Sequence, residues 1–100
     1  MSTVIVAGYV HVDPADRDRF IEGHRNIVEA GRTRPNSGCL DVSISADSVD
    51  PGRVNIFEYW ESAEALEAFR ASAPTPTVSI ALTNENVLKH QITASGPPFA

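Results

Sequence analysis

The sequence lacks the features that mark several large classes of protein. It has one cysteine, Cys39, so no disulfide can form within the chain. No apolar run approaches the ~20 residues that cross a bilayer. The first residues show no basic segment followed by a long apolar stretch, so we expect no signal peptide and no membrane partner. A lone thiol without a leader favours a cytoplasmic protein.

Basic residues and cofactor motifs are scarce as well. Eight Lys and Arg stand against 13 Asp and Glu, for a net charge of -5. Because phosphate binding relies on clustered Lys and Arg, we expect no nucleic-acid partner. The nucleotide-binding patterns GxGxxG and GxxxxGK[ST], the metal patterns CxxC and HExxH, and the nucleophile pattern GxSxG are all missing. We therefore expect neither a bound cofactor nor a metal.

The apolar content of 42% is that of a globular protein. A chain of 100 residues suffices for one domain with one core. We expect residues 1–95 to form this single domain. Residues 96–100 include two adjacent prolines, which cannot extend a sheet ladder, so they are expected to form a flexible C-terminal tail.

Four segments have the composition and alternation of strands: 3–12, 38–45, 53–60 and 87–94. In the first segment, alternation places Tyr9 and His11 on one face and four valines on the other, namely Val4, Val6, Val10 and Val12. We expect the valine face to pack on helices and the mixed face to line a cavity or a subunit contact. In the second segment Leu40, Val42 and Ile44 share one face.

Two segments repeat apolar residues at helical spacing, 14–31 and 63–73. Asp13 and Ser62 are the expected N-caps, and Pro74 ends the second helix. Thr75-Pro76 predicts the start of a short third helix. The order of elements predicts an α+β, ferredoxin-like β-α-β-β-α-β fold, in which an antiparallel four-stranded sheet carries both helices on one face.

Two short stretches are more specific. Gly38-Cys39-Leu40, followed after a hairpin by Glu58-Tyr59-Trp60-Glu61-Ser62-Ala63-Glu64-Ala65-Leu66, resembles the antibiotic biosynthesis monooxygenase-like family. The order of elements matches that family from Val4 to about Ala94. The resemblance implies a dimeric α/β barrel, a homodimer in which the open sheet faces of two subunits pack together.

The resemblance also implies an activity. Members of the family include cofactor-independent monooxygenases that oxidise phenol- or quinol-type rings with O2, and others degrade haem. The sequence departs from the family in the second helix, where the His of many members falls at Phe69-Arg70. The Asn and Trp of the haem-degrading members fall at Ala7 and Phe69, which disfavours haem degradation.

These observations predict a cofactor-independent monooxygenase-like protein that acts on a small aromatic molecule with O2. Its expected site comprises catalytic His11, Asn55 and Trp60 and substrate-binding Tyr9, Phe57 and Arg34. His11 would accept a phenolic proton, because imidazole titrates near neutral pH. Asn55 and Trp60 would orient the ring, and Arg34 would guide an anionic substrate.

Structural roles compete with each of these assignments. Trp60 can be a core aromatic that braces the helix on the sheet, with Glu58 as a structural hydrogen-bond acceptor on the same strand face. Asn55 can be an edge residue, His11 a dimer-contact histidine and His24 a structural one. The alternative function is a non-catalytic dimeric module that binds a small ligand or assists a pathway enzyme.

Overall fold

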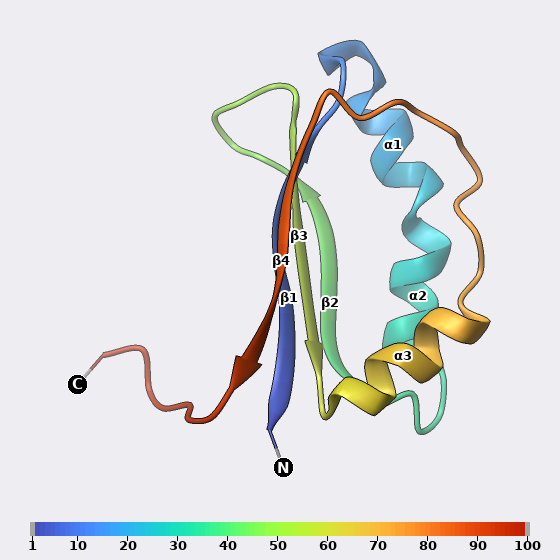
Figure 1. The fold of residues 1–100 in the computed structure, drawn as a ribbon. Helices are drawn as coiled ribbons and strands as arrows, with labels where there is room; N and C mark the ends of the chain where they lie inside the picture. Colours follow the sequence, from blue (N-terminus) through green and yellow to red (C-terminus); the bar gives the residue numbers. More distant parts are fainter. Residues whose placement is uncertain (1, 100) are drawn as a thin grey trace.

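The structure, a computed structural model, describes residues 2–99. One antiparallel sheet runs in the order β2-β3-β1-β4 and consists of β1 (Thr3–His11), β2 (Cys39–Ala46), β3 (Arg53–Trp60) and β4 (Asn84–Ile92). The helical elements are η1 (Pro14–Asp16), α1 (Arg17–Gly23), α2 (Arg25–Thr33) and α3 (Ala63–Ser72). All of them lie on one face of the sheet, and the other face is left uncovered (Figure 1). This confirms the predicted α+β, ferredoxin-like class.

The valine face of β1 forms the core, as predicted. Val4 lies opposite Trp60 and Val10 opposite Val54 in the β1–β3 register, so these side chains share the face that the helices cover. Trp60 is 1% exposed and Leu66, from α3, is 0% exposed. Burial of such large apolar side chains contributes about 1.5–3 kcal/mol each, and this side of the sheet is therefore where the fold gains its stability.

Both predicted N-caps form. The Asp13 side chain accepts a hydrogen bond from the Ala15 N–H at 2.9 Å, and Pro14 opens η1 behind it. The Ser62 hydroxyl accepts from the Ala65 N–H at 3.0 Å and starts α3. Each cap satisfies a backbone donor that the first helical turn leaves free. These two capping residues therefore mark where the helices begin.

The first helix is broken, contrary to the single helix expected over 14–31. His24 Nδ1 donates to the Phe20 carbonyl at 2.7 Å, and the imidazole stacks on the Phe20 ring at 4.1 Å between centroids. The His24 backbone N–H bonds the Ile21 carbonyl instead, which tightens the turn. The imidazole therefore takes the carbonyl that a continuous helix would have used, and α1 and α2 meet at a kink.

The expected third helix is also wrong, because residues 74–83 form an irregular strap along the outer side of the helices (Figure 1). Hydrogen bonds to backbone groups of the strap hold it against the helices. The Thr77 N–H donates to the Gly23 carbonyl at 2.9 Å, and Asn26 Nδ2 donates to the Thr75 carbonyl at 2.8 Å. A Cβ at Gly23 would overlap the Val78 side chain, so this close approach requires glycine.

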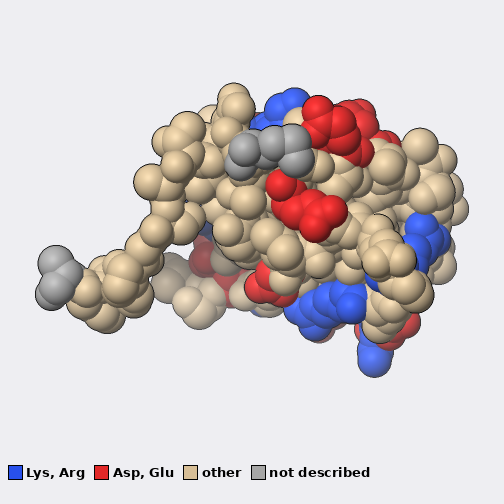
Figure 2. All heavy atoms as spheres, turned by 90° about the horizontal axis from the view of Figure 1, so that it is seen from below, with Lys and Arg blue, Asp and Glu red and all other residues tan. Residues whose placement is uncertain are grey.

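The second strand departs from the alternation pattern at its start. Leu40 does not share a buried face with Val42, because a register shift between Cys39 and Asp41 turns it outward, where it is 53% exposed. After β4 the chain extends away from the body without helix or strand as far as Phe99, and Ala100 lies outside the described residues. Figure 2 shows this uncharged tail projecting from an end where acidic and basic side chains are both present.

Candidate functional site

The residues expected to form one site lie on two faces of the sheet. Tyr9 pairs with Asn55 in the β1–β3 register, and His11 and Phe57 follow the same alternation onto the uncovered face. Trp60 pairs with Val4 on the covered face. The sheet therefore separates Trp60 from the other expected catalytic residues, and no single pocket on this chain can hold them all.

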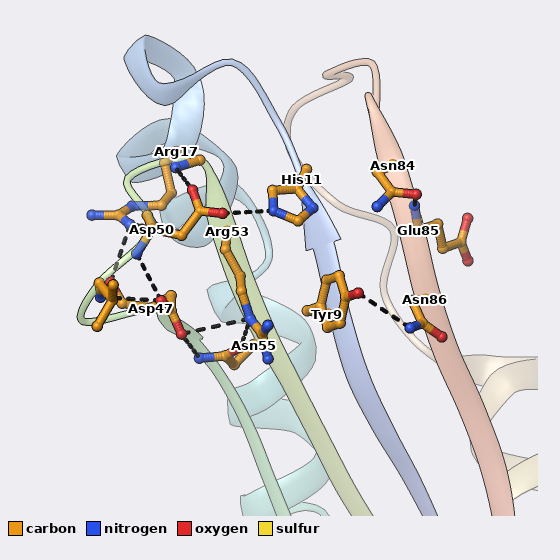
Figure 3. A network of polar contacts seen from close by, with 12 residues as sticks. Tyr9, His11, Arg17, Asp47, Asp50, Arg53, Asn55, Asn84, Glu85 and Asn86 are labelled. Carbon is orange, nitrogen blue, oxygen red and sulfur yellow. Dashed lines mark hydrogen bonds and ion pairs between the residues drawn. The ribbon is translucent and has the colours of Figure 1, made fainter.

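The imidazole of His11 is engaged by the loop between β2 and β3. His11 Nε2 lies 2.8 Å from Asp50 Oδ2, and a carboxylate can only accept, so Nε2 carries the proton (Figure 3). His11 Nδ1 is buried and has no hydrogen-bond partner within residues 2–99. Neither ring nitrogen is open to a ligand on this chain, and the geometry gives His11 a structural contact rather than a free base.

Both ends of the Asn55 amide are hydrogen-bonded, one to the same loop and the other to β3. Asn55 Nδ2 donates to Asp47 Oδ1 at 3.0 Å, and Asn55 Oδ1 accepts from Arg53 Nε at 2.7 Å. Asp47 Oδ2 also accepts from the N–H groups of Val49 and Asp50. The Asp50 N–H and the Asn55 amide lower the pKa of Asp47 from 3.8 to about 2. Asn55 thus helps to anchor the hairpin loop.

Tyr9 belongs to this polar group as well. Its hydroxyl accepts from Asn86 Nδ2 at 3.2 Å, and its ring meets the His11 ring edge-on at 5.3 Å. The Arg53 guanidinium lies 3.9 Å from the centroid of the Tyr9 ring, a cation–π contact. Figure 3 shows these side chains spread along one end of the open face rather than around a hollow.

Arg34 lies on the helical side, at the end of α2. Its Nη1 donates to the Ser72 carbonyl at 3.0 Å, and its guanidinium lies 5.5 Å from the centre of the Phe69 ring. Arg34 therefore ties the end of α2 to the end of α3. It is exposed and remote in the fold from the His11 group, so the two cannot contact one small substrate together.

A cavity that could hold a small ligand lies between the helices and the covered face of the sheet. It is a partly open, mostly apolar cavity of about 120 Å³. A cavity of about 150 Å³ lined by Leu, Ile and Phe admits one benzene ring, so this space approaches that of a single ring. Its walls come from α2, β2, β3, α3 and the residue after α3, and are Ile27, Gly31, Val42, Ile44, Glu58, Trp60, Phe69, Arg70 and Ala73.

A carboxylate and an indole stand side by side in this cavity. Trp60 Nε1 donates to Glu58 Oε1 at 3.0 Å, and both side chains project from the covered face of β3 because they are two residues apart. The Trp60 ring also packs on Phe69, with 5.1 Å between centroids. The bond fixes the indole and leaves the second oxygen of Glu58, Oε2, without a hydrogen-bond partner within residues 2–99.

Cys39 borders the same region and stays a neutral thiol. Burial, and secondly the negative charge of Glu58, raise the pKa of Cys39. A Cβ at Gly31 would lie 3.0 Å from Val42 Cγ1 but 3.4 Å from Cys39 Sγ, so the tight approach of α2 to β2 is at Val42, and Cys39 makes only ordinary van der Waals contact there. Cys39 therefore packs as a small hydrophobe rather than acting as a nucleophile.

Two features are absent from residues 2–99. No group of three or more His, Cys, Asp or Glu side chains is placed to hold a metal ion. Within the same residues, no helix has both the length and the apolar character needed to span a membrane.

Comparison with known proteins decides the family. The family model described as antibiotic biosynthesis monooxygenase matches residues 3–75, nearly three quarters of the chain. The chain belongs to this family. Membership supports a monooxygenase-like role and agrees with the resemblance seen around Cys39 and from Glu58 to Leu66.

Individual relatives are distant. The chain is 30% identical over 64 residues to the uncharacterized protein sll1783 of Synechocystis, a match that covers 64% of this chain but only 42% of that protein. The crystal structure of an antibiotic biosynthesis monooxygenase is similar with a TM-score of 0.65 at 20% identity, over 96% of this chain and all of that one. The haem degrader MhuD of Mycobacterium tuberculosis gives 0.61 at 17% identity, over 97% and 100%. At these identities the two structures establish the fold alone.

For this antibiotic biosynthesis monooxygenase family member, the cavity residues that sequence reasoning missed are informative. Glu58 was interpreted only as a structural acceptor, while Phe69 and Arg70 were noted only as departures from the family. The alternation of side chains along β3 was enough to predict which of these residues share a face. Asn55 and Trp60 are five residues apart on one strand and so must face opposite sides, whereas Glu58 and Trp60 must share a side.

Proposed function

We propose that this chain catalyses the oxidation of a small phenol- or quinol-type ring by O2, without a bound cofactor, in the cavity behind Trp60. The observation that carries the proposal is an apolar cavity of about 120 Å³ bounded by Trp60, Phe69 and the Glu58 carboxylate, in a member of a monooxygenase family. Ligand sites are typically concave and mostly apolar, with a few placed polar groups that orient the ligand.

The proposed reaction needs no electron carrier, because the substrate itself is the reductant. A ring C–H opposite the hydroxyl becomes a carbonyl, and the hydroxyl becomes the second carbonyl of a quinone. A C–O bond to one oxygen atom forms, the O–O bond breaks and the other oxygen leaves as water with the two hydrogens that the ring loses. The ring gives up four electrons and O2 takes up four. The cavity's task is to hold the ring and limit its contact with water.

A second copy of the chain is the proposed partner for the uncovered face. The middle of that face is apolar, and polar groups lie at its end, an arrangement typical of protein interfaces. By the strand register its apolar side chains are Ile5, Ala7, Phe57, Tyr59 and Leu88. In this arrangement the His11 and Asn55 group serves the subunit contact and the hairpin loop, and the substrate binds on the other side of the sheet.

Oxygen consumption in metal-free buffer tests the activity directly. The substrate series runs from single-ring phenols through 1-naphthols to anthrones, each with a free C–H opposite the hydroxyl, and the small cavity predicts that the rate falls as the rings grow. Stoichiometric O2 uptake with quinone formation is the expected result. No uptake with any substrate would contradict the proposal, and ligand binding without turnover would favour a non-catalytic ligand-binding module.

A matched pair of variants on the last turn of α3 and its end assigns the activity to the cavity. Ala73 lines the cavity, and Ala73→Leu should fill part of it and reduce the rate at least ~10-fold, since the added methylenes overpack a space of this size. Ala71 is exposed, and Ala71→Leu adds the same volume to solvent. Equal activities of the two variants would place the reaction elsewhere.

A further inference from the structure

We propose that Glu58 makes the cavity selective for uncharged rings that carry a hydroxyl, with the ligand O–H donating to Glu58 Oε2, and against rings that carry a carboxylate. The inference rests on the proposed function in taking the cavity as the ligand site, but it concerns binding and requires no oxidation.

The position of Glu58 gives the first argument. Its Oε1 accepts from Trp60 Nε1 at 3.0 Å, which holds the carboxylate in one orientation against an indole that is itself 1% exposed. Its Oε2 has no hydrogen-bond partner within residues 2–99, although Glu58 lines the cavity. A fixed carboxylate with a free acceptor beside an apolar wall is complementary to a ring hydroxyl, because an ionised carboxylate can accept but cannot donate.

The charges around the cavity give the second argument. Glu58 is the one acidic residue among the cavity walls, and its negative charge already raises the pKa of the neighbouring Cys39 thiol. The one basic wall residue, Arg70, is exposed and its Nη1 lies 3.3 Å from Glu67 Oε1, so its charge is partnered at the surface. An anionic ring would therefore meet the like charge of Glu58 beside a mostly apolar wall.

Three ligands of one ring each test the selectivity: phenol, its methyl ether anisole and benzoate. Anisole keeps the shape but loses the donor, and benzoate replaces the hydroxyl with a negative charge. Trp60 is the only tryptophan of the chain, so its fluorescence reports occupancy of the cavity wall, and calorimetry supplies the dissociation constants. Because a hydrogen bond to a charged group is worth about 1.5–3 kcal/mol, phenol should bind roughly 10- to 100-fold more tightly than anisole. Benzoate should bind more weakly than either.

Glu58→Gln and Glu85→Gln form the matched pair of variants. Each removes one negative charge, but Glu85 lies exposed on β4, and no wall of the cavity comes from that strand. In Glu58→Gln the amide oxygen can still accept from the indole, so the wall is kept, while the preference for phenol over benzoate should fall at least ~10-fold. Glu85→Gln should retain the preference of the parent chain.

The outcomes separate this inference from the proposed function. Selective binding of phenol without O2 uptake would keep the role of Glu58 and overturn the reaction. Comparable binding of all three ligands by the parent chain would overturn the selectivity, whether or not Glu58→Gln folds. If Glu85→Gln lost the preference as fully as Glu58→Gln, net charge rather than Glu58 would be responsible, and the inference would fail.

Discussion

The two faces of the sheet carry different kinds of side chain, although the same four strands supply both. The covered face holds Val4, Val10, Val54 and Trp60, all buried. The uncovered face carries aromatic and aliphatic residues in its middle and hydrogen-bonded polar residues at one end, with Leu88 59% exposed. The buried core and the apolar cavity thus belong to the first face, and the exposed apolar surface belongs to the second.

The largest contrast is expected between equivalent truncations on the two sides. Leu66→Ala removes a side chain that is 0% exposed. It should lower the free energy of unfolding by about 2–5 kcal/mol, because the core cannot fully fill the space that the missing leucine atoms leave. Leu88→Ala should change it by no more than about 0.5 kcal/mol in a dilute, monomeric sample. Urea unfolding of both variants measures the difference, and similar losses would remove the distinction between the faces.

A charge in the middle of the uncovered face should disrupt the proposed dimer. Leu88→Asp places a carboxylate opposite Ala7, and burial of that charge against a second copy should weaken association by about 2 kcal/mol or more, roughly 30-fold in Kd. Sedimentation over a concentration series provides the measurement. Leu82→Asp, on the strap that runs along the helical side, is the control. A parent chain that stays monomeric at micromolar concentration would refute the dimer.

A smaller contrast concerns one polar group on each face. Trp60→Phe keeps a buried ring but deletes the indole N–H that donates a hydrogen bond to Glu58. The free energy of unfolding should therefore fall by about 1–2 kcal/mol. Tyr9→Phe deletes a hydroxyl whose one hydrogen bond within residues 2–99 comes from the exposed Asn86, and it should cost at most about 0.5 kcal/mol. Thermal unfolding compares the two variants, and a larger loss for Tyr9→Phe would reverse the assignment.

The smallest effect is the acid dependence of the loop at the end of the uncovered face. Hydrogen bonds hold the pKa of Asp47 at about 2, below its ordinary value of 3.8. A carboxyl whose pKa is lowered by folding stabilises the folded chain at pH values above its pKa in the unfolded chain. That contribution is lost as the pH falls through its pKa in the folded chain. Asp47→Asn should therefore flatten the stability profile between about pH 4 and pH 2. Urea midpoints across this range check it, and an unchanged slope would contradict the role of Asp47.

Much of the fold could be predicted from the sequence because its determinants are local. Some effects depend only on residues close by in the sequence. They are the alternation of valines in the first strand, the N-caps Asp13 and Ser62, and the helix end at Pro74. The kink at His24 could not be predicted in this way, because it depends on a side chain that takes the Phe20 carbonyl. The strap after α3 lacks the expected helix because its backbone bonds go to Gly23 and Asn26 instead.

The candidate site was predicted less well, for a physical reason. The alternation pattern of the strands does not give the conformation of the long loop between β2 and β3, and so does not give the strand residues that its side chains reach. His11 therefore met Asp50 on the hairpin loop, a contact between residues 39 apart in sequence. Trp60 was predicted to share a site with Asn55, but the two lie on opposite faces of the sheet, as the alternation along β3 requires for residues five apart.

The most direct test of the central claim maps ligand binding on the two faces in one experiment. In ¹H–¹⁵N correlation spectra recorded during a phenol titration, the Trp60 indole N–H and the Gly31 and Phe69 amides should shift together. The amides of Tyr9, His11 and Asn55 should stay in place. Shifts confined to Tyr9, His11 and Asn55, with Trp60 unmoved, would show that the ligand binds the uncovered face and would contradict the account.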